Sequence, residues 1–210
     1  MVTTTAQTQD TPVRIMQAAK NLFAENGYEG VSIKNIARTA GVNSALISYY
    51  FGGKTQLYQA VLNQQADLFL SMMKRWNGSP LSPLRRIKQF MDEQARLHLA
   101  DPYSIYLIYR ELLTPTKAGE NVVRERIMGI YEGLAEELEK AKKEQYIHAS
   151  VDCRRASFTL ISIFALFLLT CKYESILGRG LLTGEDSFSR LQGVYTDYLQ
   201  SLSVGKEPLQ

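Results

Sequence analysis

The sequence predicts an all-α protein. Apolar residues recur at intervals of three and four along almost every segment, which is the spacing of one face of a helix. Glycines and prolines fall at intervals that leave stretches of ordinary helix length between them. The chain has 210 residues, of which 45% are hydrophobic. This length and composition are enough to bury a core, in one large domain or in two smaller ones.

The breakers and caps set the expected helix boundaries. Residues 1–12 are polar and rich in Thr and Gln, and we expect a disordered arm there. Pro12 is well placed to begin the first helix, and the third begins near Asn43 or Ser44. The expected helices cover residues 12–27, 33–40, 43–51, 54–76, 83–100, 102–113, 118–146, 151–177 and 187–202.

The segment 32–54 has the pattern of a helix-turn-helix. In this motif a short helix braces a second one across a tight turn, so that the second helix reaches base edges in the major groove. Ile36, Ala37 and Ala40 supply an apolar face on the first helix, and Gly41 permits a positive φ in the turn. The spacing therefore predicts DNA binding through the helix that follows Gly41.

The same region resembles the TetR family of bacterial regulators over about 50 residues. The resemblance rests on Leu22-Phe23-Ala24-Glu25-Asn26-Gly27-Tyr28, Ile36-Ala37, Ala40-Gly41-Val42, Tyr49-Tyr50-Phe51 and Lys54. It implies a DNA-binding domain at residues 13–58 and a helical domain for ligand binding and dimerisation at residues 59–210. Residues 109–116, Tyr-Arg-Glu-Leu-Leu-Thr-Pro-Thr, together with residues 45–47 and 49–54, are similar to a subset of the family related to the CerR/CecR regulators.

The resemblance also implies which residues face duplex DNA. Ser32 and Lys54 look like phosphate-binding residues, and Lys34 faces the duplex, where it contacts either a base or a phosphate. The full expected set is Ser32, Lys34, Asn43, Ser44, Ala45, Leu46, Ser48, Tyr49, Tyr50 and Lys54. Tyr50 is equally well explained as a core residue. Many members of the family have Gly-Thr-Leu-Tyr at the positions of residues 45–48, so the operator sequence does not follow from the resemblance.

Charge and cysteine usage limit the interpretation only weakly. The net charge is +3, with five basic and three acidic residues up to Tyr58. Cys153 and Cys171 lie 18 residues apart in one expected helix, about 27 Å at 1.5 Å per residue, so they do not pair. The N-terminal residues do not resemble a signal peptide, and we expect a cytoplasmic protein. The largely apolar run 158–171 is shorter than the roughly 20 residues that span a bilayer.

The C-terminal domain is expected to bind a small organic effector and to form a homodimer. Aromatic walls and polar anchors for a hydrophobic or planar inducer come from Trp76, Phe90, His98, Tyr103, Tyr106, Arg110, Tyr131, Phe164 and Phe167, although each is also explained as an ordinary core residue. Arg110 and Glu111 are also explained as a structural ion pair. The helix 151–177 is apolar all round, which predicts that it pairs with its copy together with helix 187–202.

Two-fold symmetry implies a roughly palindromic operator, and the resemblance implies a repressor released by its ligand.

Two other classes of protein compete with this interpretation. An enzyme is disfavoured, because His98 and His148 have no metal-site spacing around them and no nucleophile motif or phosphate loop is present. We expect no cofactor and no metal. A helical protein that binds lipid or another protein would lack salt-sensitive DNA binding.

Overall fold

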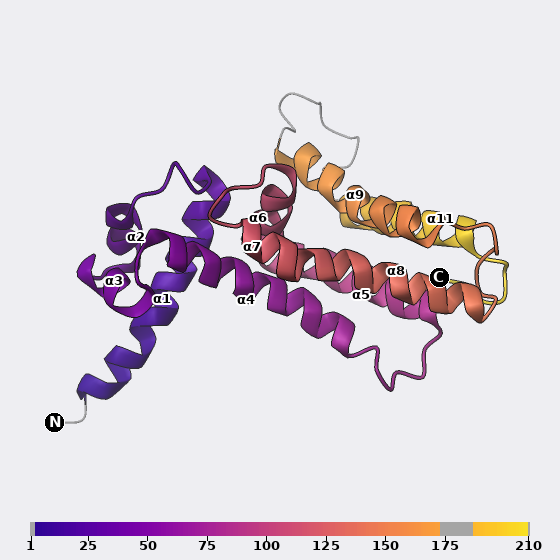
Figure 1. The fold of residues 1–210 in the computed structure, drawn as a ribbon, viewed down its shortest axis with the longest axis horizontal. Coiled ribbons are helices and arrows are strands. Elements are labelled where there is room, and N and C mark those ends of the chain that lie inside the picture. The colour runs from indigo at the N-terminus through magenta and orange to yellow at the C-terminus, as the bar shows by residue number, and fades with distance from the viewer. Residues whose placement is uncertain (1–2, 173–186, 210) are drawn as a thin grey trace. The chain divides into compact units, whose positions relative to one another are not determined.

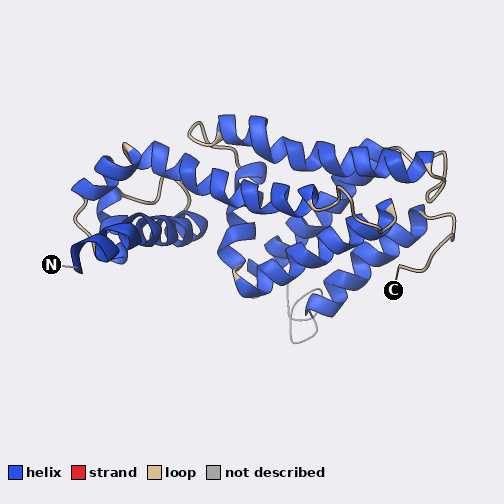
Figure 2. Ribbon diagram, turned by 90° about the horizontal axis from the view of Figure 1, so that it is seen from below, coloured by secondary structure: helices blue, strands red, loops and turns tan. Residues whose placement is uncertain are grey.

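The computed structural model describes residues 3–172 and 187–209, and all regular elements in this part of the chain are helices (Figures 1 and 2). Ile147 and Ser203 form one isolated antiparallel bridge. The helices are α1 (Thr3–Asn26), α2 (Ile33–Ala40), α3 (Ala45–Phe51), α4 (Lys54–Lys74), α5 (Pro83–Ala100), α6 (Pro102–Leu113), α7 (Glu120–Val122), η1 (Val123–Ile127), α8 (Met128–Lys143), α9 (Cys153–Lys172) and α11 (Ser187–Leu202). The predicted fold class is confirmed.

Two expected boundaries are wrong. Residues 3–12 are helical rather than a disordered arm, because Pro12 is the only helix breaker among them and α1 continues through it. The expected helix 118–146 is three consecutive elements, with a π-helical turn, η1, between α7 and α8. A π-helical turn depends on hydrogen bonds displaced by one residue, and hydrophobic spacing does not reveal it. Residues 173–177 of another expected helix lie outside the described residues.

The chain divides into two compact units. The first contains residues 1–68 and 101–127, and the second contains residues 69–100 and 128–210. The α6 segment is therefore grouped with the N-terminal helices, although the family resemblance assigns everything after residue 58 to the second domain. That boundary stays a prediction. Among the described residues, no helix combines the length and hydropathy that crossing a membrane requires.

The core of the first unit is an aromatic cluster where α1 and α4 meet. The rings of Phe23 and Tyr58 are 4.8 Å apart in an edge-to-face arrangement, and Tyr28 lies 4.9 Å from Tyr58. Helix α1 also packs against α2 and α6. The ammonium of Lys20, which is buried, forms an ion pair with Asp101 just before α6. These contacts fix α1 as the central helix of this unit.

The end of α1 is covered by a side chain from α6. Gly27 follows the helix with φ of 73°, which favours glycine. The Arg110 guanidinium lies directly above it and donates a hydrogen bond to the Ala24 carbonyl at 3.3 Å. A Cβ at residue 27 would lie 2.3 Å from Arg110 Nη2. The backbone conformation therefore selects glycine here, and a Cβ would in addition displace the Arg110 guanidinium.

The second unit is a helical bundle in which α5 packs against α8 and α11, and α9 packs against α8 and α11 (Figure 1). Polar contacts join its helices. Glu137 on α8 is buried and pairs with Arg86 on α5 at 2.6 Å. Asp92 on α5 accepts hydrogen bonds from Tyr195 and Gln192 on α11. Each acid has partners on another helix besides a lysine on its own, Lys140 for Glu137 and Lys88 for Asp92, so the contacts between helices help to fix the packing of α5.

Candidate nucleic-acid interface

The first helix of the helix-turn-helix is capped at both ends by its own sequence. Ser32 has an extended backbone, and its hydroxyl accepts a hydrogen bond from the Asn35 amide at 3.1 Å. At the other end Gly41 has φ of 64°, and the Val42 amide donates to the Ala37 carbonyl at 3.0 Å. The predicted positive φ of the turn glycine is confirmed, and Ser32 is the N-cap of the helix. The caps fix α2 between residues 33 and 40.

The second helix, α3, begins with an Asn43 side chain that accepts a hydrogen bond from the Ala45 amide at 2.9 Å. Ile47 is fully buried and attaches the helix to the core, together with Ile36, Ala37 and Ala40 of α2. Gly52, with φ of 84°, ends α3. Ile36, Ala37 and Ala40 are the apolar face that the sequence predicts, and Ile47 packs with them, so the opposite face of α3 is directed outward.

That opposite face is polar and aromatic. Tyr49 is 78% exposed, and its ring meets the Tyr50 ring edge-on at 5.0 Å. The expected DNA-contacting residues divide into an exposed group, Ser32, Lys34, Asn43, Ser44, Ala45, Ser48 and Tyr49, and a half-buried group, Leu46, Tyr50 and Lys54. An exposed tyrosine hydroxyl beside small polar groups can donate hydrogen bonds to phosphate oxygens.

Lys54, at the start of α4, is held by an aromatic ring. Its ammonium lies 4.2 Å from the centre of the Tyr28 ring, within the range of a cation–π interaction. The Tyr28 hydroxyl is also 2.7 Å from the Thr55 hydroxyl. The two contacts fix the first turn of α4 beside the loop that follows α1, and they orient the ammonium that the resemblance assigns to phosphate binding.

Arg14 on α1 also holds the end of α2 in place, and the sequence did not indicate this role. Its Nη2 donates hydrogen bonds to the carbonyls of Ala40 at 2.5 Å and Gly41 at 3.0 Å. These carbonyls end α2 and have no helical partner, so a cation is favourable there. The contact spans 26 residues of sequence, and no local spacing points to it.

Helix α6 is joined to α4 through a buried carboxylate. Glu111 is fully buried, and it accepts hydrogen bonds from the Tyr58 hydroxyl at 2.5 Å and from the Thr116 amide and hydroxyl at 2.8 and 2.9 Å. Burial and the bond to Glu111 raise the pKa of Tyr58 above its ordinary value, so the hydroxyl stays a donor. Gln59 donates to the Ala118 carbonyl at 2.9 Å. Two donors from α4 and two from Thr116 thus fix the contact between α4, α6 and the loop after α6.

The expected ligand-binding residues are distributed over both units. Tyr103, Tyr106 and Arg110 belong to the first unit, where the Tyr103 hydroxyl donates to Glu25 at 2.7 Å. In the described part of the chain Arg110 and Glu111 form no ion pair with each other, because they project from α6 toward different partners. The other members, Trp76, Phe90, His98, Tyr131, Phe164 and Phe167, belong to the second unit.

Within the second unit these residues form separate ring contacts. Trp76 meets Phe90 at 5.8 Å, and His98 meets Phe167 at 5.5 Å. Phe164 stacks on Tyr195, a residue that the sequence did not single out, and the Tyr131 hydroxyl donates to the Arg154 carbonyl. Their roles in ligand binding stay predictions. Within the described residues no three His, Cys, Asp or Glu side chains are grouped as a metal site.

These features define an all-helical protein with an N-terminal helix-turn-helix and a larger helical domain. Residues 15–61 match the family model described as bacterial regulatory proteins, tetR family. Residues 15–61 are thus a helix-turn-helix domain of the TetR type, and this match supports a TetR-family transcriptional regulator. Its similarity to the CerR/CecR subset is not confirmed.

Relatives and solved structures agree with this assignment. The HTH-type transcriptional regulator RutR of Escherichia coli K12 is 30% identical over 123 residues, which are 59% of this chain and 56% of RutR. The chain thus matches little more than half the length of that relative. The crystal structure of HlyIIR, a hemolysin II transcriptional regulator, has 25% identity, covers 93% of this chain and 98% of its own, and gives a TM-score of 0.67. FadR from Bacillus subtilis, crystallised with stearoyl-CoA, shares the fold, with 18% identity, coverage of 93% and 99%, and a TM-score of 0.71.

Proposed function

We propose that this protein is a ligand-responsive transcriptional repressor that binds a palindromic operator as a homodimer and is released by a small, largely hydrophobic or aromatic inducer. A regulator that binds chromosomal DNA acts where that DNA is, in the cytoplasm. The observation that carries the proposal is the exposed face of α3. There Tyr49 and small polar side chains face outward, whereas Ile47 is buried.

The chemistry of this face suits duplex DNA. Asn43 uses its Oδ1 to cap α3, so its amide group remains to donate to base acceptors. Lys34 on α2 supplies an exposed positive charge, and Lys54 supplies one at the start of α4. Ala45 provides a methyl group at the first turn of α3, which suits contact with a thymine methyl. Phosphate contacts would come from the cations and base contacts from α3.

Dimerisation is supported by apolar side chains that α9 leaves exposed. Phe158 is 66% exposed and Leu166 is 58% exposed, and a spacing of eight residues puts them on one face of the helix. Val194 on α11 is 42% exposed. Exposed aromatic and aliphatic residues on neighbouring helices are typical of an interface between copies. A two-fold dimer would present two α3 helices to successive major grooves.

The proposal of an inducer rests on the aromatic residues of the second unit and on the thermodynamic coupling between ligand binding and DNA binding. A ligand weakens operator binding only if it binds more tightly to a conformation with low affinity for DNA. FadR, which shares the fold alone, was crystallised with the acyl thioester stearoyl-CoA. This supports the proposal that the helical domain of such a fold accommodates an apolar effector.

Salt-dependent binding to duplex DNA tests the proposal. Fragments enriched from genomic DNA by the wild-type protein serve as probes, and affinity is measured by fluorescence anisotropy at several salt concentrations. We expect Lys34→Ala combined with Tyr49→Ala to weaken binding at least about tenfold, because each contact contributes roughly 1–3 kcal/mol. Lys34→Ala alone should reduce the salt slope by about 1 if it contacts a phosphate.

The matched control is Lys143→Ala, which removes an exposed charge at the end of α8 in the second unit. It should leave both affinity and slope unchanged. Wild-type affinity for the double variant, or equal losses in the control, would show that the α2–α3 face is not the DNA-binding surface.

A further inference from the structure

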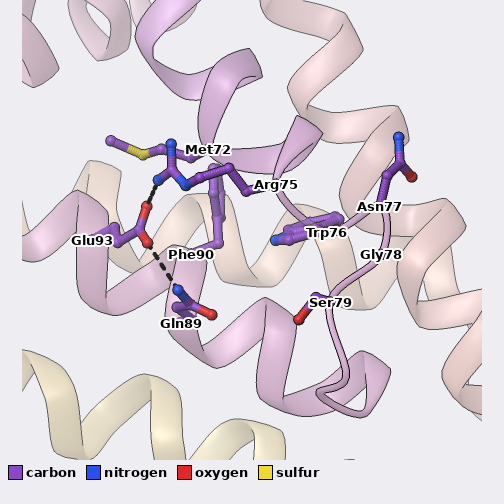
Figure 3. A pocket seen from close by; sticks show the side chains of 9 residues that line it. All are labelled: Met72, Arg75, Trp76, Asn77, Gly78, Ser79, Gln89, Phe90 and Glu93. Carbon is purple, nitrogen blue, oxygen red and sulfur yellow. Dashed lines mark hydrogen bonds and ion pairs between the residues drawn. The ribbon is translucent and has the colours of Figure 1, made fainter.

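The second unit contains a pocket of about 260 Å³ between the end of α4 and α5 (Figure 3). Met72, Arg75 and Trp76 come from the last turn of α4 and the residues after it, and Gln89, Phe90 and Glu93 come from α5. The side chains of both segments meet over the same hollow, whereas the Asn77 amide points away from the rest. The volume lies just below the range of about 300–1,000 Å³ that is typical of small-molecule sites.

One wall of the pocket is aromatic. The rings of Trp76 and Phe90 are 5.8 Å apart and almost perpendicular, at 80°. Phe90 is buried, and it also contacts the Phe69 ring at 6.5 Å, so its position is fixed by the core. Trp76 is half-buried and presents part of its indole to the pocket. A flat apolar group can pack against these rings with little rearrangement.

The polar wall offers donors rather than acceptors. Glu93 accepts a hydrogen bond from Gln89 at 3.1 Å through one oxygen and pairs with Arg75 through the other, so both carboxylate oxygens already have a partner. Arg75 is 55% exposed; its Nη2 pairs with Glu93, and its Nη1 donates one hydrogen bond to the Ser71 carbonyl at 3.4 Å. Its planar guanidinium has further N–H groups at the rim of the pocket, and the Trp76 indole adds another donor. A group with negative charge is therefore the best match.

We propose that this pocket binds a small planar aromatic carboxylate. The ring packs against Trp76 and Phe90, and the carboxylate binds Arg75, whose fork geometry suits two parallel hydrogen bonds. The volume limits the ligand to one or two rings. This inference names the class of effector for the proposed regulator and rests on that function for its regulatory consequence. Binding itself does not require DNA.

Intrinsic fluorescence tests the proposal directly, because Trp76 is the only tryptophan of the chain. Full-length protein is titrated with benzoate, with benzamide as a neutral ligand of the same shape and with benzylammonium as a cationic one. We expect a saturable change in Trp76 emission with benzoate and an affinity at least about tenfold lower for the other two ligands, since only benzoate forms a charged pair with Arg75. Calorimetry provides a second readout of the same affinities.

Two variants and one control identify the anchor. Arg75→Gln should remove the preference for benzoate over benzamide, and Glu93→Gln should strengthen benzoate binding severalfold because the competing carboxylate is gone. Lys74→Gln removes an exposed charge beside Arg75 that does not line the pocket, and it should bind benzoate like the wild type. Circular dichroism checks that each variant is folded.

Several outcomes would overturn the proposal: no saturable signal, equal affinity for benzamide, tighter binding of benzylammonium, loss of benzoate binding in Glu93→Gln, or the same loss in Lys74→Gln as in Arg75→Gln. Operator binding is measured separately by anisotropy. Benzoate binding without DNA binding would refute the proposed function but support the proposed ligand of the pocket. DNA binding without benzoate binding would refute the proposed ligand but support the proposed function.

Discussion

The Tyr58 hydroxyl on α4 donates a hydrogen bond to the Glu111 carboxylate on α6 across 2.5 Å, and both side chains are buried. The Tyr58 ring belongs to the aromatic cluster that attaches α1 to α4. The bond therefore connects the core beneath the helix-turn-helix to the segment 101–127, which is more than forty residues further along the chain. This segment is a structural part of the N-terminal unit.

Loss of the Glu111 carboxylate should destabilise the protein. Glu111→Ala leaves the buried Tyr58 hydroxyl and the two half-buried Thr116 donors without their acceptor, and we expect a cost of about 1–3 kcal/mol in the free energy of unfolding. Tyr58→Phe removes one bond to a carboxylate and should cost about 1.5–3 kcal/mol. Urea denaturation measures both. Glu120→Gln, at an exposed carboxylate, is the control and should stay within about 0.5 kcal/mol of wild type.

The contact between Arg14 and the end of α2 should be measurable as a coupling energy. Arg14→Ala leaves two α2 carbonyls without their donor and should cost about 1 kcal/mol. Gly41→Ala puts a Cβ on a residue with φ of 64° and should cost about 1–2 kcal/mol. That Cβ would also lie 2.8 Å from Arg14 Nη2, so the double variant should lose less than the sum of the two. Strict additivity in a double-mutant cycle would contradict the geometry.

Charged substitutions on α9 should separate the proposed dimer. Phe158→Glu combined with Leu166→Glu replaces two exposed apolar side chains by carboxylates, and in a two-fold interface each change counts twice. Burying one such side chain contributes about 1.5–3 kcal/mol, so sedimentation should show the variant as a monomer at concentrations where the wild type is dimeric. Leu113→Glu, at another exposed leucine, should remain dimeric. A dimeric double variant would place the interface elsewhere.

Stability should depend on the protonation of His98. Burial lowers the pKa of His98 from its ordinary value of 6.5, and its buried Nδ1 has no hydrogen-bond partner among the residues that the structure describes. The unfolded chain therefore binds a proton more readily than the folded one as pH falls below 6.5, and stability is lost through that window by up to about 1.4 kcal/mol per pH unit. His98→Asn should remove this loss in denaturation curves between about pH 7 and pH 5. Two results would contradict the assignment of this pH dependence to His98: an equal loss of stability at low pH in His98→Asn and wild type, or removal of that loss by His148→Asn, a change at an exposed histidine.

The local parts of the fold could be predicted from the sequence. Ser32 and Gly41 act on their immediate neighbours, and the buried face of α2 follows from a repeat of three and four residues, so a short stretch contains all the information. The same holds for α5, α6 and α11, whose predicted bounds agree with the structure.

Contacts between distant segments could not be predicted in this way. The hydrogen bonds of Arg14 to α2 and of Tyr58 to Glu111 join residues 26 to 53 positions apart, and no periodicity encodes such pairs. For the same reason the aromatic residues expected around one cavity are divided between two units. Trp76 and Phe90 stay predicted ligand-binding residues, and the structure adds Arg75 as a residue of the same pocket, because the sequence does not show that it pairs with a residue on α5.

Because the Arg110 guanidinium lies above Gly27, the two residues together determine which substitutions position 27 tolerates. A larger side chain at position 27 meets a guanidinium as well as an unfavourable φ, so removing the arginine would relieve only the first obstacle. The guanidinium is the far end of a flexible side chain and can shift, whereas the φ of 73° stays, so asparagine is the non-glycine residue that position 27 tolerates best. Laboratory evolution of the loop after α1 should accordingly accept asparagine at position 27 before any other replacement.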